Sequence, residues 1–317
     1  MKFSRYLLLF LTCLFSFAGC KSSGSGLPPL EPLSLLSSDL SIYVHVPVEH
    51  HKELTARLLS AEVPSISKED ALTLASRIRH LYAGLGTVKD RSYLEMASDI
   101  DIPSIAKKKV FSSKNGWKTS EYKSPVPEPV VPADFSLYSR DDMEFLLSFA
   151  SDDVLAVSKS INPMLDRAAV RESILDTPYN AWINRDSQDI LFYITRSGQY
   201  LNSLLGARVT VNSDYVYGSI KYRPDPKRPG VYSGLYDLSF SVHLKDMRTV
   251  QAFRSMLSLS FGLMGCEITQ TDECTLMVSG VEVSARQIEN LFTRDPITGK
   301  HYRVEGDRII TEQVKKK

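Results

Sequence analysis

The sequence has almost no excess charge of either sign. Its 38 Lys and Arg residues are balanced by 37 Asp and Glu residues, which leaves a formal net charge of +1. A protein that binds nucleic acid through its phosphates needs a basic surface, so this balance argues against such a partner. With 16 Gly and 16 Pro in 317 residues, the chain is neither collagen-like nor of low complexity. Its length suits one large domain or two ordinary ones.

Long apolar runs are absent after the first 20 residues. The one early run, from Tyr6 to Phe17, is shorter than the roughly 20 helical residues needed to cross a bilayer. Lys2 and Arg5 precede it, and small residues follow it, which is the pattern of a cleaved export signal. We therefore expect residues 1–19 to be a signal peptide and the rest of the chain to lack a transmembrane helix.

The end of this signal carries a recognisable motif. Phe17-Ala18-Gly19-Cys20 resembles the lipobox of bacterial lipoprotein precursors, in the looser form familiar in spirochaetes, with Phe17 in place of the usual Leu. The resemblance covers only the first 20 residues. It implies cleavage before Cys20, a diacylglycerol on the Cys20 sulfur and an acyl chain such as palmitate on its amino group. It also implies a lipid anchor in a bacterial cell membrane, with the body on the extracytoplasmic or periplasmic face.

Cysteine is scarce. Of four cysteines, Cys13 lies in the signal and Cys20 is assigned to lipid, which leaves Cys266 and Cys274. In a compartment where disulfides persist, these two form a possible disulfide, with two reduced, buried thiols as the alternative. A metal site at this pair is not expected, because no other Cys or His with ligand spacing lies nearby.

Motifs of catalysis are missing as well. Gly24-Ser25-Gly26 lies in a polar tether and not at a strand-to-helix turn, and Gly84-Leu85-Gly86 follows a predicted helix where a phosphate loop would precede one. No P-loop, HExxH, CxxC or EF-hand pattern occurs. The sequence therefore predicts a protein that is not an enzyme and has no cofactor, although a catalytic triad need not be local in sequence.

Three of the six histidines lie close together. His45, His50 and His51 stand beside Glu49 and Glu53, and His50 and Glu53 are the weak candidates for metal ligands. Because His45 lies within a predicted strand and His51 borders a predicted core, we expect ordinary structural histidines and no metal site.

Tyrosine, in contrast, is concentrated in one stretch. Seven of the 15 tyrosines lie between residues 193 and 236. The possible binding surface predicted from them consists of Tyr215, Tyr217, Tyr222, Tyr232 and Tyr236. A planar aromatic surface suits sugar rings or a partner protein. The alternative is that these rings only pair across strands and stabilise a long ribbon.

Local patterns predict the main elements. We expect a strand at 41–46, a helix that Ser67 and Asp70 cap and that continues to a stop at Gly84, and a helix after Asp246. Residues 207–222 and 231–245 predict a long hairpin, and residues 300–311 a short final one.

Two pairs of segments match each other. Asp39 to Val44 matches Asp189 to Ile194, and Leu155 to Ser158 matches Leu276 to Ser279, each of the latter followed by a helix start. The predicted fold class is therefore α+β, with two tandem, possibly duplicated units, each a largely antiparallel sheet with helices packed on one face. The predicted segments are a signal (1–19), Cys20 with a flexible tether (20–38), a first unit (39–175, with a Pro-rich loop at 124–133), a second unit (186–312) and a basic tail (313–317).

These observations favour a lipid-anchored protein of the cell envelope that binds or scaffolds without catalysis. Its expected partners are the membrane, through the lipid anchor, and other envelope proteins, while its ligand is unknown. One alternative is a periplasmic carrier that holds an apolar ligand between its halves. Another is an envelope hydrolase with a dispersed active site.

Overall fold

The computed structural model describes residues 29–62, 66–88, 91–141, 143–198, 211–261, 265–293, 302–305 and 308–311. The described residues form two compact units. Unit 1 comprises those within Met1–Leu40 and Ser76–Asn184, and unit 2 those within Ser41–Ala75 and Arg185–Lys317. The predicted segments differ from these units. Residues 176–184 and the described residues of the predicted tether, 29–38, belong to unit 1, and residues 41–75 fold with the C-terminal part of the chain.

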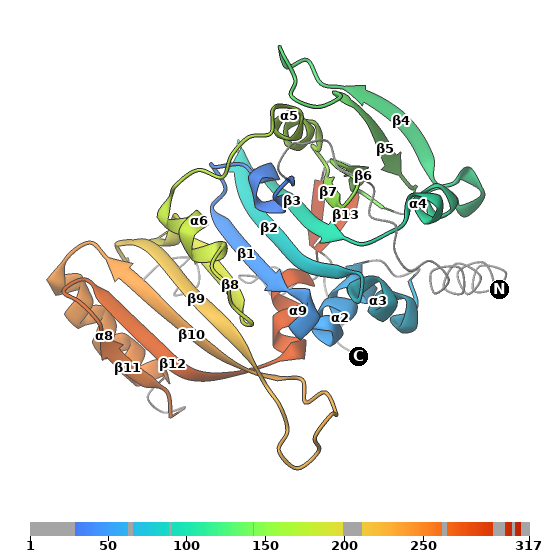
Figure 1. Cartoon of the computed structure of the whole chain (residues 1–317). Helices are drawn as coiled ribbons and strands as arrows, with labels where there is room; N and C mark the ends of the chain where they lie inside the picture. Colours follow the sequence, from blue (N-terminus) through green and yellow to red (C-terminus); the bar gives the residue numbers. More distant parts are fainter. Residues whose placement is uncertain are drawn as a thin grey trace. The chain divides into compact units, whose positions relative to one another are not determined.

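The sheet of unit 2 explains this exchange. Its strands follow the order β11-β12-β10-β9-β8-β1 and all pair antiparallel (Figure 1). The strands are β1 (Ile42–Pro47), β8 (Ile190–Ile194), β9 (Ser213–Arg223), β10 (Leu235–Leu244), β11 (Glu267–Gln270) and β12 (Thr275–Ser284). β1 pairs with β8, with Tyr43 opposite Tyr193. The two segments that match in sequence are therefore neighbours, while the duplication itself stays a prediction.

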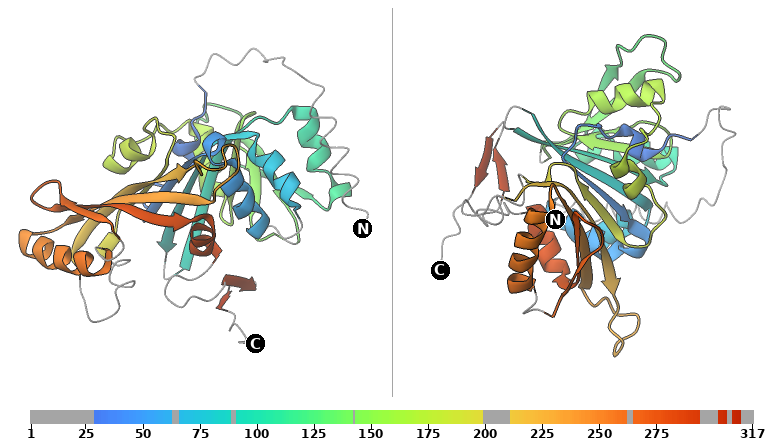
Figure 2. Two further views of the ribbon diagram at one scale, coloured as in Figure 1. Left: turned by 90° about the horizontal axis from the view of Figure 1, so that it is seen from below. Right: turned by 90° about the vertical axis from the view of Figure 1, so that its left-hand side faces the viewer.

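The helices of unit 2 are η2 (Val48–His50), α2 (Lys52–Glu62), α3 (Lys68–Ala75), α8 (Met247–Phe261) and α9 (Ala285–Thr293). α8 buries Val250, Phe253 and Leu257 against the outer strands. α2 and α9 cover the same face further along, where Leu54 and Ile288 share a core with Tyr236 (Figure 2). This arrangement confirms the predicted class of antiparallel sheet with helices on one face.

The strands of unit 1 follow the order β2-β3-β7-β6-β5-β4 and all pair antiparallel. They are β2 (Ile78–Val88), β3 (Arg91–Ile100), β4 (Lys118–Lys123), β5 (Asp134–Ser139), β6 (Leu146–Phe149) and β7 (Val154–Ser158). The helices of unit 1 are η1 (Pro32–Leu35), α4 (Ser104–Val110), η3 (Ser113–Asn115), α5 (Asn162–Val170) and α6 (Pro178–Ile183). α5 buries Met164, Leu165, Ala168 and Ala169 and contacts η1.

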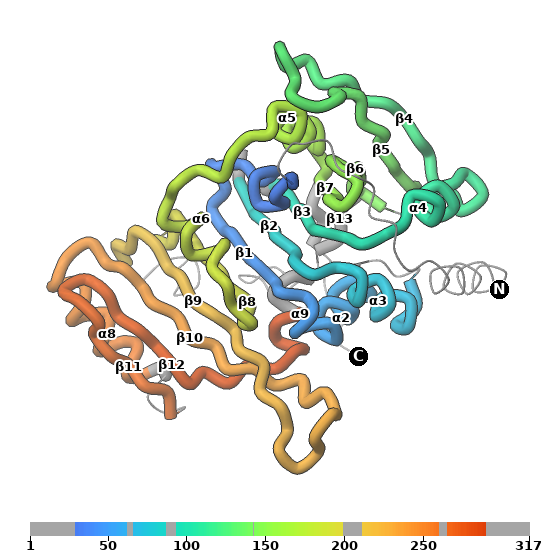
Figure 3. The backbone as a smooth tube through the Cα atoms, viewed as in Figure 1, coloured from blue at the N-terminus to red at the C-terminus, as the bar shows by residue number. Residues whose placement is uncertain are grey.

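Most of the predicted elements are present. The strand at 41–46, the helix after Asp246 and the long hairpin correspond to β1, α8 and the β9–β10 pair, and the charged tip of that hairpin extends away from the strands (Figure 3). The final hairpin is β13 (Tyr302–Glu305) with β14 (Arg308–Thr311). The Pro-rich loop at 124–133 joins β4 to β5 within unit 1 and is held to α5 by a bond of 2.8 Å from the Val130 amide to the Ala169 carbonyl.

The predicted helix from Ser67 to Gly84 is wrong in its second half. The cap is correct, since the Asp70 amide donates to Ser67 Oγ at 3.1 Å, but α3 ends at Ala75 and β2 begins at Ile78. Ile78 and Tyr82 are both buried. They are four positions apart, a spacing that fits one face of a helix and one face of a strand equally well, so periodicity alone does not distinguish the two.

Candidate functional site

The first described segment of the chain forms a strap, defined here as residues 30–40, on unit 1. Its leucines are buried: Leu30, Leu33, Leu35, Leu36 and Leu40. η1 lies within it and contacts α5, β2, β3 and β7. Burying an apolar side chain of this size contributes about 1.5–3 kcal/mol. The strap is therefore part of the core of unit 1 and not a loose end.

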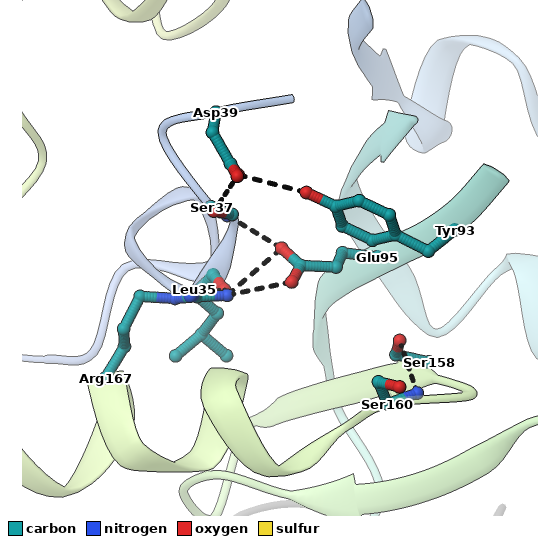
Figure 4. A network of polar contacts seen from close by, with 8 residues as sticks. All are labelled: Leu35, Ser37, Asp39, Tyr93, Glu95, Ser158, Ser160 and Arg167. Atoms are coloured by element: carbon teal, nitrogen blue, oxygen red, sulfur yellow. Dashed lines mark hydrogen bonds and ion pairs between the residues drawn. The ribbon is translucent and has the colours of Figure 1, made fainter. Parts of the chain in front are cut away.

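A buried ion pair holds the middle of the strap (Figure 4). Arg167 on α5 donates from Nε and Nη2 to the Leu35 carbonyl at 2.8 and 2.6 Å, and from Nη2 to both oxygens of Glu95 at 3.1 and 3.0 Å. The side chains of Arg167 and Glu95 are 16% and 5% exposed. Glu95 lies on β3 opposite Ser158 of β7, on the sheet face that meets α5. One guanidinium therefore joins strap, helix and sheet.

The same network continues toward the end of the strap. The Ser37 amide donates to Glu95 Oε2 at 2.7 Å, and the Tyr93 hydroxyl donates to Asp39 Oδ1 at 3.0 Å. The hydrogen bond from Ser37 Oγ holds the pKa of Asp39 below its usual value. Burial raises the pKa of Glu95, although Arg167 acts in the opposite direction. Burial and the bond to Asp39 raise the pKa of Tyr93 to about 12, so the phenol stays a donor.

A small cavity lies beside Arg167, with a volume of about 140 Å³. Strap residues and the segment after α5 line it: Leu33, Ser34, Leu36, Ser37, Ser38, Glu172, Ser173, Ile174, Leu175, Tyr179 and Asn180. Pockets for ligands of drug size usually measure about 300–1,000 Å³ and are mainly apolar. This cavity is smaller and rich in hydroxyls, so it does not suit an acyl chain, and its lining contains neither His nor Cys.

The predicted tyrosine surface is divided between the two faces of the sheet in unit 2. Tyr222 and Tyr236 lie on the face that α2 and α9 cover, where Tyr236 is fully buried and its hydroxyl lies 3.0 Å from that of Tyr232. Tyr215 and Tyr217 lie on the opposite face. The reason is strand parity, because residues an odd number of positions apart on one strand point to opposite faces. The prediction grouped these tyrosines by their nearness in the chain and did not consider which face of the sheet each one occupies.

Four rings form what we call the aromatic face: Tyr193, Tyr215, Tyr217 and His243. His243 stacks on Tyr215 with 4.6 Å between ring centroids and an angle of 3° between the planes. Tyr193 lies 5.6 Å from Tyr215 and 6.1 Å from Tyr217, again nearly parallel. The flat sides of these rings stack on one another, so the rings do not form the planar platform expected for binding sugar rings.

What this face offers instead is ring edges and polar groups. Tyr215, Tyr217 and His243 are half-buried. His243 Nδ1 lies 3.0 Å from Thr275 Oγ1, which fixes the imidazole ring. Burial and the neighbouring tyrosines raise the pKa of Tyr193 to about 12 and that of Tyr215 in the same direction, so both hydroxyls remain protonated donors. Rigid, neutral, amphipathic groups of this kind are common at protein interfaces.

The histidines that lie close together in the sequence are not arranged as a metal site. His45 is buried on β1, and His51 is buried with Nε2 2.8 Å from the Gln188 carbonyl and its ring stacked on Tyr236. His50 pairs with Glu49 at 3.1 Å. Among the described residues, no group of three or more His, Cys, Asp or Glu side chains is arranged to hold a metal ion. The candidate pair His50 and Glu53 gains no third ligand there.

The two body cysteines are free thiols, both half-buried. β11 pairs with β12 so that Glu267 lies opposite Ser279, and Cys266 Sγ lies 3.6 Å from the Gly280 carbonyl. Cys274 lies at the other end of the hairpin, six residues along β12 from Gly280, or about 20 Å at 3.3 Å per residue. A disulfide needs Cα atoms within about 7 Å, so the register does not allow the predicted bond.

The signal, Cys20, the basic tail and the first part of the predicted tether, to residue 28, lie outside the described residues. The prediction of a flexible tether is wrong for residues 30–38, because they belong to the strap, whose leucines are buried in the core of unit 1. Within the described part of the chain, none of the helices combines the length and the apolar character that spanning a bilayer requires.

Comparison with protein families places the folded body. Residues 28–289 match the family model of the outer membrane-associated lipoprotein TP0453. The chain belongs to this family. The TP0453 family match begins at residue 28, shortly after Cys20, and therefore includes the strap. The sequence reasoning identified the lipobox but did not recognise the family of the body.

Solved structures agree with this membership of the TP0453 family. Crystal forms I and III of TP0453 each align with a TM-score of 0.61 at 16% sequence identity, and crystal form IV with a TM-score of 0.58 at 14%. Each alignment covers 83% of this chain, and 97–98% of the TP0453 chain. At such low identity the likeness shows a shared fold. No curated protein gives a significant match.

Proposed function

We propose that this protein is a lipid-anchored component of the bacterial cell envelope that binds or scaffolds other molecules without catalysis, attached through Cys20 to the outer membrane. The observation that carries the proposal is the coincidence of two independent signals. A lipobox ends at Cys20, and the body from residue 28 belongs to a family described as outer membrane-associated lipoproteins. The two signals are independent, because the family match begins at residue 28 and does not include the lipobox.

The chemistry of the anchor follows from this assignment. A diacylglycerol on the sulfur and an acyl chain on the amino group give Cys20 three hydrocarbon chains. Each buried CH₂ contributes about 0.8 kcal/mol, so three chains hold a protein at a bilayer far more firmly than one chain does. The near-zero net charge means that electrostatic attraction to anionic lipid adds little, and the anchor supplies the attachment.

A binding role without catalysis is supported by how the polar groups are used. The buried Arg167–Glu95 pair holds the strap, and His51 serves the core of unit 2. The aromatic face is the surface that we propose for contact with a partner, because its half-buried rings are rigid and keep neutral hydroxyls at their edges. Those edges suit a protein surface better than the flat side of a sugar ring.

The anchor is tested by replacing its cysteine in the native host. Cys20→Ser should abolish incorporation of radioactive palmitate and move the protein out of the outer-membrane fraction. Cys13→Ser, which changes a cysteine inside the signal, is the matched control and should label like the wild type. Palmitate on the Cys20→Ser protein would contradict the proposed anchor.

The contact surface is tested by photo-crosslinking in the same cells. A photoreactive residue in place of Ser239, which lies on the strand face of Tyr217 and His243, should give one dominant adduct. The same residue in place of Gln251, exposed on α8, is the control. Equal adducts at both positions, or none at Ser239, would contradict a binding role for the aromatic face.

A further inference from the structure

The strap is the first folded segment after the proposed lipid anchor. The chain from Cys20 to Leu30 spans at most about 35 Å when fully extended, and the chain from Cys20 to Ser41 at most about 70 Å. Whether the strap is docked on unit 1 therefore sets how far the body can stand from the membrane. This step rests on the proposed function, because it takes Cys20 as the attachment point.

Side chains tie the strap to the rest of unit 1. Its own backbone bonds include two local ones, from the Ser34 amide to the Glu31 carbonyl and from the Leu36 amide to the Leu33 carbonyl. Its backbone is then bound by Arg167 at the Leu35 carbonyl, by Glu95 at the Ser37 amide and by the Tyr179 hydroxyl at the Ser38 carbonyl, 3.2 Å away. β3 and β7, in contrast, are joined by a continuous backbone ladder. A segment held in this way can separate while the sheet stays intact.

Arg167 is the polar group that joins the strap to both α5 and β3, in addition to the apolar hold of the buried leucines. It binds the Leu35 carbonyl directly, and it is the cation that allows the Glu95 carboxylate to remain buried and to accept from Ser37. Without Arg167, Glu95 is a buried carboxylate with no cationic partner in the network, a costly state that protonation or exposure to water relieves. Undocking the strap supplies that exposure.

We propose that residues 30–40 act as a latch, with Arg167 and Glu95 as its catch, that sets the reach of the lipid anchor. When the strap is docked, the point where it meets unit 1 lies within about 35 Å of the bilayer surface. When the strap is released, this limit doubles. A molecule in the adjoining cavity that competes for Arg167, which lines that cavity, favours release.

Hydrogen exchange on the full chain tests the latch. In Arg167→Met, the amides of residues 31–38 should exchange about 100-fold faster than in the wild type, while the amides that pair β3 with β7 keep their protection. Arg79→Met is the matched control, since it removes an exposed arginine paired with Asp99 in the same unit and should change neither set. Loss of protection in strap and sheet together, or no change in the strap, would overturn the proposal.

Two further variants cover the case in which Arg167→Met does not fold. Arg167→Lys keeps a cation beside Glu95 but loses the paired donors to Leu35, and it should give an intermediate rate in the strap. Leu33→Ala weakens the apolar hold and leaves the ion pair intact, and it should also speed exchange in the strap alone. Exchange that stays coupled to the sheet in both variants would equally overturn the latch.

The reach itself is measured by neutron reflectometry on the lipidated protein at a supported bilayer. The protein layer should begin within about 35 Å of the headgroups in the wild type and extend further in a variant that combines Arg167→Met with Leu33→Ala, because this variant loses both the ion pair and part of the apolar hold. A protein that washes off the bilayer overturns the anchor on which the reach depends. A retained protein whose layer does not change overturns the latch, so the two failures are distinct.

Discussion

His51 is a buried imidazole with one satisfied nitrogen. Nε2 lies 2.8 Å from the Gln188 carbonyl and must carry the proton that it donates, while Nδ1 has no hydrogen-bond partner in the described part of the chain. Charging the ring therefore places a proton on Nδ1 where nothing accepts it. Burial accordingly lowers the pKa of His51 below its ordinary value of 6.5.

This shift predicts a loss of stability in mild acid. The unfolded chain binds a proton at His51 near pH 6.5 and the folded chain only at lower pH, so the free energy of unfolding should fall as the pH drops from 6.5 toward the folded pKa. Urea unfolding at pH 7 and pH 5.5 measures it. His51→Gln should flatten this part of the profile. An unchanged slope in His51→Gln would contradict the assignment.

At the scale of single residues, sequence reasoning succeeded where a motif is local and failed where a contact is distant. Cys20 stands out because its neighbours form the lipobox. Nothing local marks Glu95, whose partners Arg167 and Ser37 lie 72 and 58 positions away in the chain. The one available signal was a carboxylate on the same strand face as Ala97, a buried residue, and such a charge demands a partner without naming it.

Among the elements, α9 has the clearest start. Gln287 Oε1 accepts from the Ser284 amide at 2.7 Å, and the Gln287 amide donates to Ser284 Oγ at 3.2 Å. These two bonds form a reciprocal cap between Ser284 and Gln287. The cap directs α9 onto the sheet, where Ile288 joins the core around Tyr236.

Removing this cap should therefore destabilise unit 2. Ser284→Ala leaves the Gln287 amide without its acceptor and should lower the free energy of unfolding by about 1 kcal/mol, measured by urea denaturation. The control is Ser255→Ala, because Ser255 Oγ only bonds back to the Gln251 carbonyl within α8, an interaction that does not favour a helix. Equal losses in the two variants would show that the cap has no special role.

The elements also show the limits of periodicity. A spacing of four residues fits a helix and a strand alike, and for this reason the predicted helix at 67–84 ran into β2. The same parity rule separates Tyr217 from Tyr222, which are five positions apart on β9 and so face opposite sides of the sheet. In both cases the composition was informative, and the missing information was which residues share a face.

For the whole molecule, the exchange of residues 41–75 decides which pieces can fold. β1 completes the sheet of unit 2 beside β8, and Leu54 on α2 belongs to the core that holds Tyr236 and Ile288. No sequence pattern encodes such a pairing between distant segments, which is why the tandem boundaries at 39–175 and 186–312 seemed natural from the sequence alone.

A fragment of residues 186–312 should consequently not fold by itself. It lacks β1 and α2, so β8 is left as an open edge and the core around Tyr236 is exposed. Fusing residues 41–75 to its amino end through a flexible linker should restore a cooperative thermal transition in circular dichroism. A cooperative transition in the fragment alone would contradict the division of the chain into these two units.

The route of the chain through the two units also determines the order of events during synthesis. Ribosomes synthesise the amino end first, at about 5–20 residues per second. About 140 residues lie between β1 and β8, so roughly 7–30 s pass between the synthesis of β1 and that of β8. During that interval Val44 and Leu54 have no partner from the late part of the chain. All residues of unit 1 have been synthesised by Asn184, before the later residues that unit 2 requires. The newborn protein therefore passes through a half-assembled stage with apolar surface uncovered, and in that stage a holding chaperone would protect it from aggregation.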